Sequence, residues 1–163
     1  MKAKALVLAV IFGIAAAAGS YAIGLGAQFN LGSTDKFFAP GIALALSPAD
    51  KFHMAFNWYL DDAYTKIGLT ADAAPLDQYL GSPSSPLSLT LGIGVFANLT
   101  FVENDMDFDA GLRIPVGFAL WLGDRAFEIY THIAPSFNIG VVPAPNLKNI
   151  FFPVALGARL WIR

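Results

Sequence analysis

From residue 23 onward, the chain alternates between apolar residues and small or polar residues with a period of two. Successive side chains of a β-strand point to opposite faces, so this alternation predicts strands rather than helices. Turn-forming clusters such as Gly32-Ser33-Thr34-Asp35 separate the alternating segments. The predicted fold class is therefore all-β, with eight strands. Their predicted ranges are 23–31, 37–46, 52–60, 63–72, 87–101, 108–122, 126–139 and 151–163.

The two faces of these strands differ in bulk and in charge. One face is apolar and carries no charged residue, as in Leu112, Ile114 and Val116, whereas the other is rich in glycine, as in Gly111 and Gly117. Large side chains fit the convex outside of a narrow barrel, and small ones fit its crowded inside. Only 13% of the residues are charged, about half the share expected of a soluble surface. We therefore expect a transmembrane barrel of eight antiparallel strands, closed because lipid cannot hydrogen-bond an open sheet edge.

The first residues have the pattern of a secretory signal. Lys2 and Lys4 precede an apolar run over 5–18 that ends in small residues, and this run is too short for a typical transmembrane helix. We expect residues 1–22 to be a signal peptide cleaved after Ala18 or Ala22, and residues 23–163 to form the barrel domain. An uncleaved anchor is the alternative.

The absence of cysteine excludes a disulfide framework, a thiolate metal site and a lipid-modified cysteine. The net charge of −2 leaves no basic surface for nucleic acid, which is not expected as a partner.

The expected orientation places both ends of the barrel on the periplasmic side. Loops 32–36, 61–63, 102–107 and 140–150 then face outward, and turns 47–51, 73–86 and 123–125 face inward. The segment 73–86 is predicted to be irregular because it contains prolines and serines. Aromatic residues near the strand ends suggest two girdles at the membrane interfaces. The first comprises Phe37, Phe38, Trp58, Tyr64, Phe101, Phe108, Phe151 and Phe152, and the second comprises Phe52, Trp121, Phe127 and Trp161.

Charged and hydrogen-bonding residues on the inward face form a candidate polar network in the lumen. Buried charges need partners, and the predicted strand order places Glu128 between Arg113 and Arg159. We expect this network to fill the lumen as a structural element; a gated ion pathway is the alternative. Its members are Lys66, Asp109, Arg113, Glu128, Tyr130, His132 and Arg159, with His53 nearby.

Three segments resemble the OmpA-like transmembrane β-barrel family of spirochaete outer membranes. They are Leu112-Arg113-Ile114-Pro115-Val116-Gly117-Phe118, Phe127-Glu128-Ile129-Tyr130-Thr131-His132-Ile133-Ala134-Pro135 and Phe152-Pro153-Val154-Ala155-Leu156-Gly157-Ala158-Arg159. The resemblance implies an eight-stranded barrel that lacks a peptidoglycan-binding domain and has no enzymatic activity. One departure is the ending Leu160-Trp161-Ile162-Arg163, since outer-membrane barrels commonly end on an aromatic residue.

No pattern in the sequence predicts an active site. His53 and His132 lie on non-adjacent predicted strands, with no serine pattern for nucleophilic catalysis and no carboxylate spacing typical of zinc. No catalytic residue, metal or cofactor is therefore expected. The expected role is structural or in surface interaction at the cell outer membrane, with a small gated channel and a lipid-active barrel enzyme as alternatives. Expected partners are outer-membrane lipid, the assembly machinery and host or envelope components that contact the loops.

Overall fold

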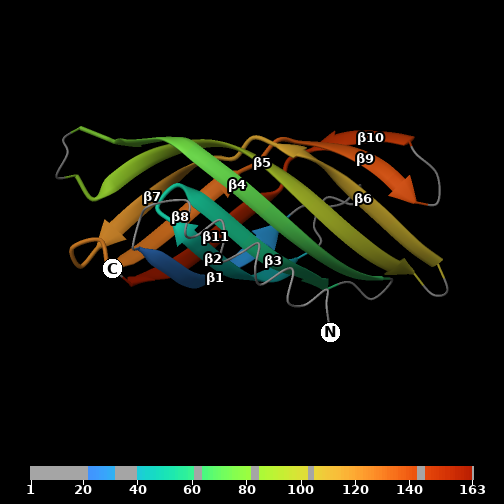
Figure 1. The fold of residues 1–163 in the computed structure, drawn as a ribbon, viewed down its shortest axis with the longest axis horizontal. Helices are drawn as coiled ribbons and strands as arrows, with labels where there is room; N and C mark the ends of the chain where they lie inside the picture. Colours follow the sequence, from blue (N-terminus) through green and yellow to red (C-terminus); the bar gives the residue numbers. More distant parts are fainter. Residues whose placement is uncertain are drawn as a thin grey trace.

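In the computed structural model, eleven β-strands form one antiparallel sheet that curves into a barrel (Figure 1). The structure describes residues 22–31, 40–60, 64–81, 85–102, 105–142 and 146–162, so the predicted signal peptide lies outside the described residues except for Ala22. The described part contains no helix long and apolar enough to cross a membrane. The strands are β1 (Ile23–Leu31), β2 (Gly41–Ala49), β3 (Phe52–Leu60), β4 (Thr65–Tyr79), β5 (Leu87–Val102), β6 (Asp105–Arg113), β7 (Val116–Leu122), β8 (Phe127–Ile133), β9 (Ser136–Val142), β10 (Asn146–Phe151) and β11 (Val154–Ile162).

Three pairs of consecutive strands, β6–β7, β8–β9 and β10–β11, are single passes interrupted at a proline. Each interruption is two residues long and contains Pro115, Pro135 or Pro153, which cannot donate a hydrogen bond to the ladder. The proline carbonyls still accept: Ile114 N–H donates to the Pro135 carbonyl and Ala134 N–H to the Pro153 carbonyl, both at 2.9 Å. The described strands therefore make eight passes, as predicted.

The barrel closes through two pairings, β1 with β11 and β5 with β7. Following the register from Phe29 through β2, β3 and β4 leads to Leu99 of β5, whereas following it through β11, β8 and β7 leads to Leu89 of the same strand. The ladder is thus staggered by ten residues around the circumference. For eight strands, such a stagger corresponds to a strand tilt of about 40° and to an interior just wide enough for side chains to fill.

The outside of the barrel is apolar, as the alternation predicts. Leu44 is 68% exposed and Leu160 is 60% exposed, whereas the buried residues include charged ones. An uncharged apolar exterior around a polar interior reverses the arrangement of a soluble protein.

Several predicted boundaries are wrong. Strand β4 continues to Tyr79, so the first half of the segment 73–86 is strand rather than an irregular loop. Pro75 lies within a register shift between Ala73 and Leu76, where a bulge accommodates it. The predicted outer loops 102–107 and 140–150 are also shorter, because β6 begins at Asp105 and β10 begins at residue 146.

Candidate functional site: the polar lumen

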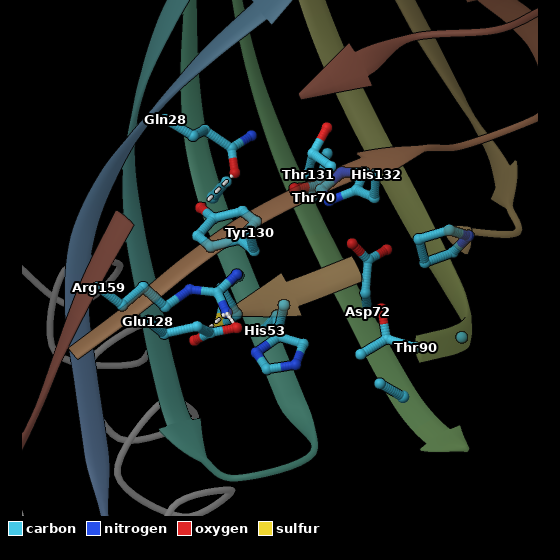
Figure 2. Close-up of a pocket in the computed structure, with 16 residues that line it drawn as sticks. Gln28, His53, Thr70, Asp72, Thr90, Glu128, Tyr130, Thr131, His132 and Arg159 are labelled. Atoms are coloured by element: carbon cyan, nitrogen blue, oxygen red, sulfur yellow. Dashed lines mark hydrogen bonds and ion pairs between the residues drawn. The ribbon is translucent and has the colours of Figure 1, made fainter. Parts of the chain in front are cut away.

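The centre of the lumen holds a buried ion pair between neighbouring strands. Glu128 of β8 lies directly opposite Arg159 of β11, and the Arg159 Nη1 atom is 3.0 and 3.2 Å from the two carboxylate oxygens. Trp161 Nε1 also donates to Glu128, at 2.9 Å, and the Arg159 guanidinium lies 3.8 Å from the centre of the Tyr130 ring. Figure 2 shows Arg159, Glu128 and Tyr130 pointing into the same space. Both charges are less than 5% exposed and are compensated mainly by each other.

Arg113 belongs to a second cluster, and the prediction that it flanks Glu128 is wrong. Its Nε atom is 3.2 Å from Asp72 Oδ1, and its Nη2 atom is 3.0 Å from His132 Nε2. The register of the hairpin around the 123–126 turn explains the difference: Arg113 pairs with Ser136 of β9, whereas Glu128 pairs with Trp121 of β7. The two residues therefore lie at different heights along the barrel.

Asp72 was not predicted as a site residue, although it is buried and completes the Arg113 cluster. The predicted strand 63–72 ended at this position, which suggested a loop boundary rather than a lumen position. The same alternation that places Lys66, Gly68 and Thr70 inside also places Asp72 inside. The parity of the strand could therefore have identified it.

A row of carboxamides extends from the ion pair toward the other end of the lumen. Tyr130 OH donates to Gln28 Oε1 at 2.8 Å, and Gln28 Nε2 donates to Asn30 Oδ1 at 2.7 Å. Asn30 Nδ2 in turn donates to Asn57 Oδ1 at 2.9 Å. This chain connects β8, β1 and β3 across the interior and was not predicted as a network, since it depends on the barrel register.

The remaining predicted residues, Asp109 and Lys66, which are buried, and His53, which is partly buried, have other partners. Asp109 accepts a hydrogen bond from Asn98 Nδ2 at 2.9 Å, and the Lys66 ammonium lies 5.7 Å from the centre of the Tyr59 ring. His53 Nδ1 is 2.8 Å from Ser47 Oγ. The predicted network is thus several local clusters within one lumen.

Among the residues that the structure describes, the charges of the buried side chains balance. The buried cationic residues are Lys66, Arg113 and Arg159, and the buried anionic ones are Asp72, Asp109 and Glu128. A balanced set in a low-dielectric interior satisfies its own charges and leaves no excess charge of one sign to select ions. Within the described residues, no group of three or more His, Asp or Glu side chains is placed to hold a metal ion.

Two small cavities lie between these side chains. One cavity of about 40 Å³ is bordered by His53, Asp72, Glu128, Tyr130 and Arg159 among others, and a second, of about 20 Å³, by Asn30, Asn57 and Arg113. Thr70 and His132 border both cavities. Since one water molecule needs roughly 10–15 Å³ by this measure, the two cavities hold only a few waters.

Aromatic side chains fill the lumen beyond these cavities. At the end nearest the C-terminus, Trp121 and Trp161 have ring centres 5.6 Å apart, and at the other end Phe96 and Phe151 have ring centres 5.5 Å apart. The assignment of Trp121 and Trp161 to a membrane girdle is wrong, since they are only 8% and 6% exposed and lie inside. Phe151 packs inside in the same way, whereas Trp58 is 50% exposed on the outside, and Phe37 and Phe38 lie outside the described residues.

Inward-facing glycines make room for the large lumen side chains. A methyl group at Gly157 would overlap the Tyr130 ring, and one at Gly94 would overlap the Asp72 carboxylate. In each case the glycine lies directly across the ladder from the large residue. The cross-strand pairs of this kind are Gly24 with Trp161, Gly41 with Tyr59, Gly68 with Asn98, Gly94 with Asp72, Gly111 with Phe96, Gly117 with His132 and Gly157 with Tyr130.

This closed, filled barrel is similar to solved structures. The crystal structure of Neisserial surface protein A (NspA) matches with a TM-score of 0.53 and 16% identity, over 85% of this chain and 95% of that chain. The fold is that of a small outer-membrane barrel. The N-terminal β-barrel domain of Pseudomonas aeruginosa OprF matches with a TM-score of 0.52 and 13% identity, over 86% of this chain and 97% of that chain.

At these identities, the similarity concerns the fold alone. No protein-family model matches the sequence, and no curated protein matches it either. The spirochaete family suggested by the sequence therefore gains no support from these comparisons.

Proposed function

We propose that the chain is an outer-membrane protein whose barrel is anchored in lipid and whose outer loops contact other molecules of the cell surface. The observation that carries this proposal is the uncharged apolar exterior around a charge-balanced polar lumen. Water solvates such an exterior poorly, whereas hydrocarbon solvates it well. Membership in the spirochaete OmpA-like family and a cleaved signal peptide at 1–22 are part of the same proposal.

The filled lumen favours this role over the small channel. Paired aromatic side chains lie toward each end, and the space between them holds only a few waters. The proposal includes no enzymatic activity. His53 contacts the Ser47 hydroxyl, but Ser47 is fully buried and a substrate would not reach it. Outer-membrane lipid, the assembly machinery and host or envelope molecules are the proposed partners.

The first test asks whether the protein is a membrane barrel. Mature protein extracted into detergent should give a β-type circular dichroism spectrum and should change its gel mobility on heating. The wild-type protein and Arg159→Ala should both leave a planar bilayer electrically silent. Protein that stays in the soluble fraction would refute the proposal, and steady ion currents through the wild type would favour the channel.

The second test asks which rim faces the outside. The sequence contains no cysteine, so single cysteines can be labelled without background. Asp105 and Asp50 are both exposed and lie on opposite rims. A membrane-impermeant maleimide should label Asp105→Cys on intact cells and Asp50→Cys only after permeabilisation. Labelling of Asp50→Cys alone on intact cells would show that the barrel has the opposite orientation, in which the proposed outer loops do not face the cell surface.

A further inference from the structure

The turn between β7 and β8 closes one mouth of the barrel in an unusual conformation. The Ala126 N–H donates to the Gly123 carbonyl at 2.9 Å, and the two central residues, Asp124 and Arg125, have φ angles of 52° and 67°. Two positive φ angles at the centre of a hairpin turn are typical of type I′, which favours Asn-Gly at these positions. Arg125 thus occupies a position where glycine would be less strained.

The side chain of Arg125 compensates for this strain by stacking on two rings. Its guanidinium carbon lies 4.6 Å from the centre of the Trp121 ring and 5.0 Å from the centre of the Tyr79 ring. Trp121 and Tyr79 belong to the apolar cluster that also contains Trp161, whose backbone N–H donates to the Ala126 carbonyl. Figure 1 shows the β7–β8 turn at the same end of the barrel as the C-terminus of the chain and the C-terminal end of β4. Arg125 therefore covers Trp121, one member of the indole pair, at this mouth.

The contacts that hold this cover in place are incomplete. Arg125 Nε and Tyr79 OH are both buried without a hydrogen-bond partner. Buried polar atoms without partners favour any state in which water reaches them. By contrast, the two indoles behind Arg125 are held, since Trp121 Nε1 donates to Ser88 and Trp161 Nε1 donates to Glu128.

We propose that Arg125 is a displaceable cap over this mouth of the barrel, and that its movement away from Trp121 and Tyr79 admits water and small solutes to the indole pair and to the cavity beside Glu128. The turn strain and the two unpartnered atoms make the open state accessible, and the two cation–π contacts hold the cap closed. The cap controls access from one side only, because the Phe96–Phe151 pair lies toward the other end.

The test measures how readily acrylamide quenches the lumen tryptophans. A Trp58→Phe background removes the exposed tryptophan and leaves Trp121 and Trp161. Loss of the two stacking contacts in Arg125→Ala should raise the quenching constant by about fivefold. Arg125→Lys, which keeps the positive charge, should give a smaller increase. Unchanged heat-dependent gel mobility shows that each variant keeps the barrel.

Arg125→Gly separates the stacking from the strain. Glycine relaxes the turn but removes the cap, so the proposal predicts increased quenching in this variant. Decreased or unchanged quenching in a folded Arg125→Gly protein would overturn the proposal. If the turn variants fail to fold, Tyr79→Leu removes one stacking partner from outside the turn and should also raise the quenching constant; no change in that variant would overturn the proposal.

Discussion

At the residue scale, the lumen is organised by pairs in which one side chain is large and its cross-strand neighbour is glycine. Tyr130 lies over Gly157, and this position lets its hydroxyl reach Gln28. The same arrangement places Asp72 over Gly94, next to Arg113. Glycine in these strands therefore provides space for the polar clusters, although it weakens a strand in other settings.

Gly157→Ala should destabilise the barrel by overpacking. The added methyl group would overlap the Tyr130 ring and displace its hydroxyl from Gln28, at a cost of about 1–3 kcal/mol. Urea unfolding in lipid vesicles measures this loss. Gly24→Ala is the matched control, since its methyl group would lie 3.1 Å from Cε2 of the Trp161 indole and needs only a small shift. Equal losses in the two variants would contradict this role of Gly157.

Removal of one partner of the Glu128–Arg159 pair should lower the free energy of unfolding more than removal of both. Arg159→Met leaves a buried carboxylate without its cation and should cost about 3–5 kcal/mol of unfolding free energy. The double variant Glu128→Leu/Arg159→Met removes both charges and should recover most of that loss. A double-mutant cycle by urea unfolding measures the coupling, and strictly additive losses would show that the two side chains act independently.

At the element scale, the sequence predicts the strands best where alternation is uninterrupted. The predicted ranges 23–31 and 52–60 coincide with β1 and β3. The prediction fails where a bulge shifts the period: β4 was cut short before the shift between Ala73 and Leu76, and β10 was missed beside the shift between Leu147 and Ile150. Alternation assumes one residue per position, and a bulge adds an extra residue.

The sequence predicts which residues line the lumen but not which of them contact one another. Alternation placed Arg113, Glu128 and Arg159 on the inner face, where the structure has them. Which of them meet depends on the register between neighbouring strands, which no single strand encodes. The buried indoles were misplaced because their aromatic character was weighted above their position, although Trp121 alternates in step with Gly117 and Ala119.

The proline interruptions give a prediction about the ladder itself. Ile114 N–H donates to the Pro135 carbonyl, so the reciprocal bond to the Ile114 carbonyl lacks only a donor at position 135. Pro135→Ala supplies this donor. Pro153→Ala supplies one facing the Ala134 carbonyl, which already accepts from Ser136 Oγ at 2.7 Å. Loss of the proline ring frees the unfolded chain equally in both variants, so this effect cancels in the comparison. Because only Pro135→Ala gives a partner to a carbonyl that lacks its ladder bond, its free energy of unfolding should exceed that of Pro153→Ala by about 1 kcal/mol.

Hydrogen exchange and urea unfolding together check this comparison. A slowly exchanging amide should appear at position 135 in Pro135→Ala. If Pro153→Ala were as stable as Pro135→Ala, or more stable, the Ser136 hydroxyl would not replace the missing ladder bond as described.

At the scale of the whole molecule, the stability of the barrel depends on which solvent its outside meets. Leu44, Leu160 and Trp58 are among many large apolar residues exposed on the outside, while the described interior is polar, charge-balanced and nearly filled. Closure of the ladder between β1 and β11 satisfies the backbone on that surface. These features together fit a barrel surrounded by hydrocarbon.

Quenching by lipids with brominated acyl chains tests this claim most directly. Trp58 is the only one of the three tryptophans that lies on the exposed face, since Trp121 and Trp161 are buried in the lumen. We predict that brominated lipid strongly quenches the fluorescence of the wild-type protein in vesicles and has little effect on Trp58→Phe. Equal quenching of the two proteins, or no quenching of either, would show that this face does not contact lipid and would contradict the account.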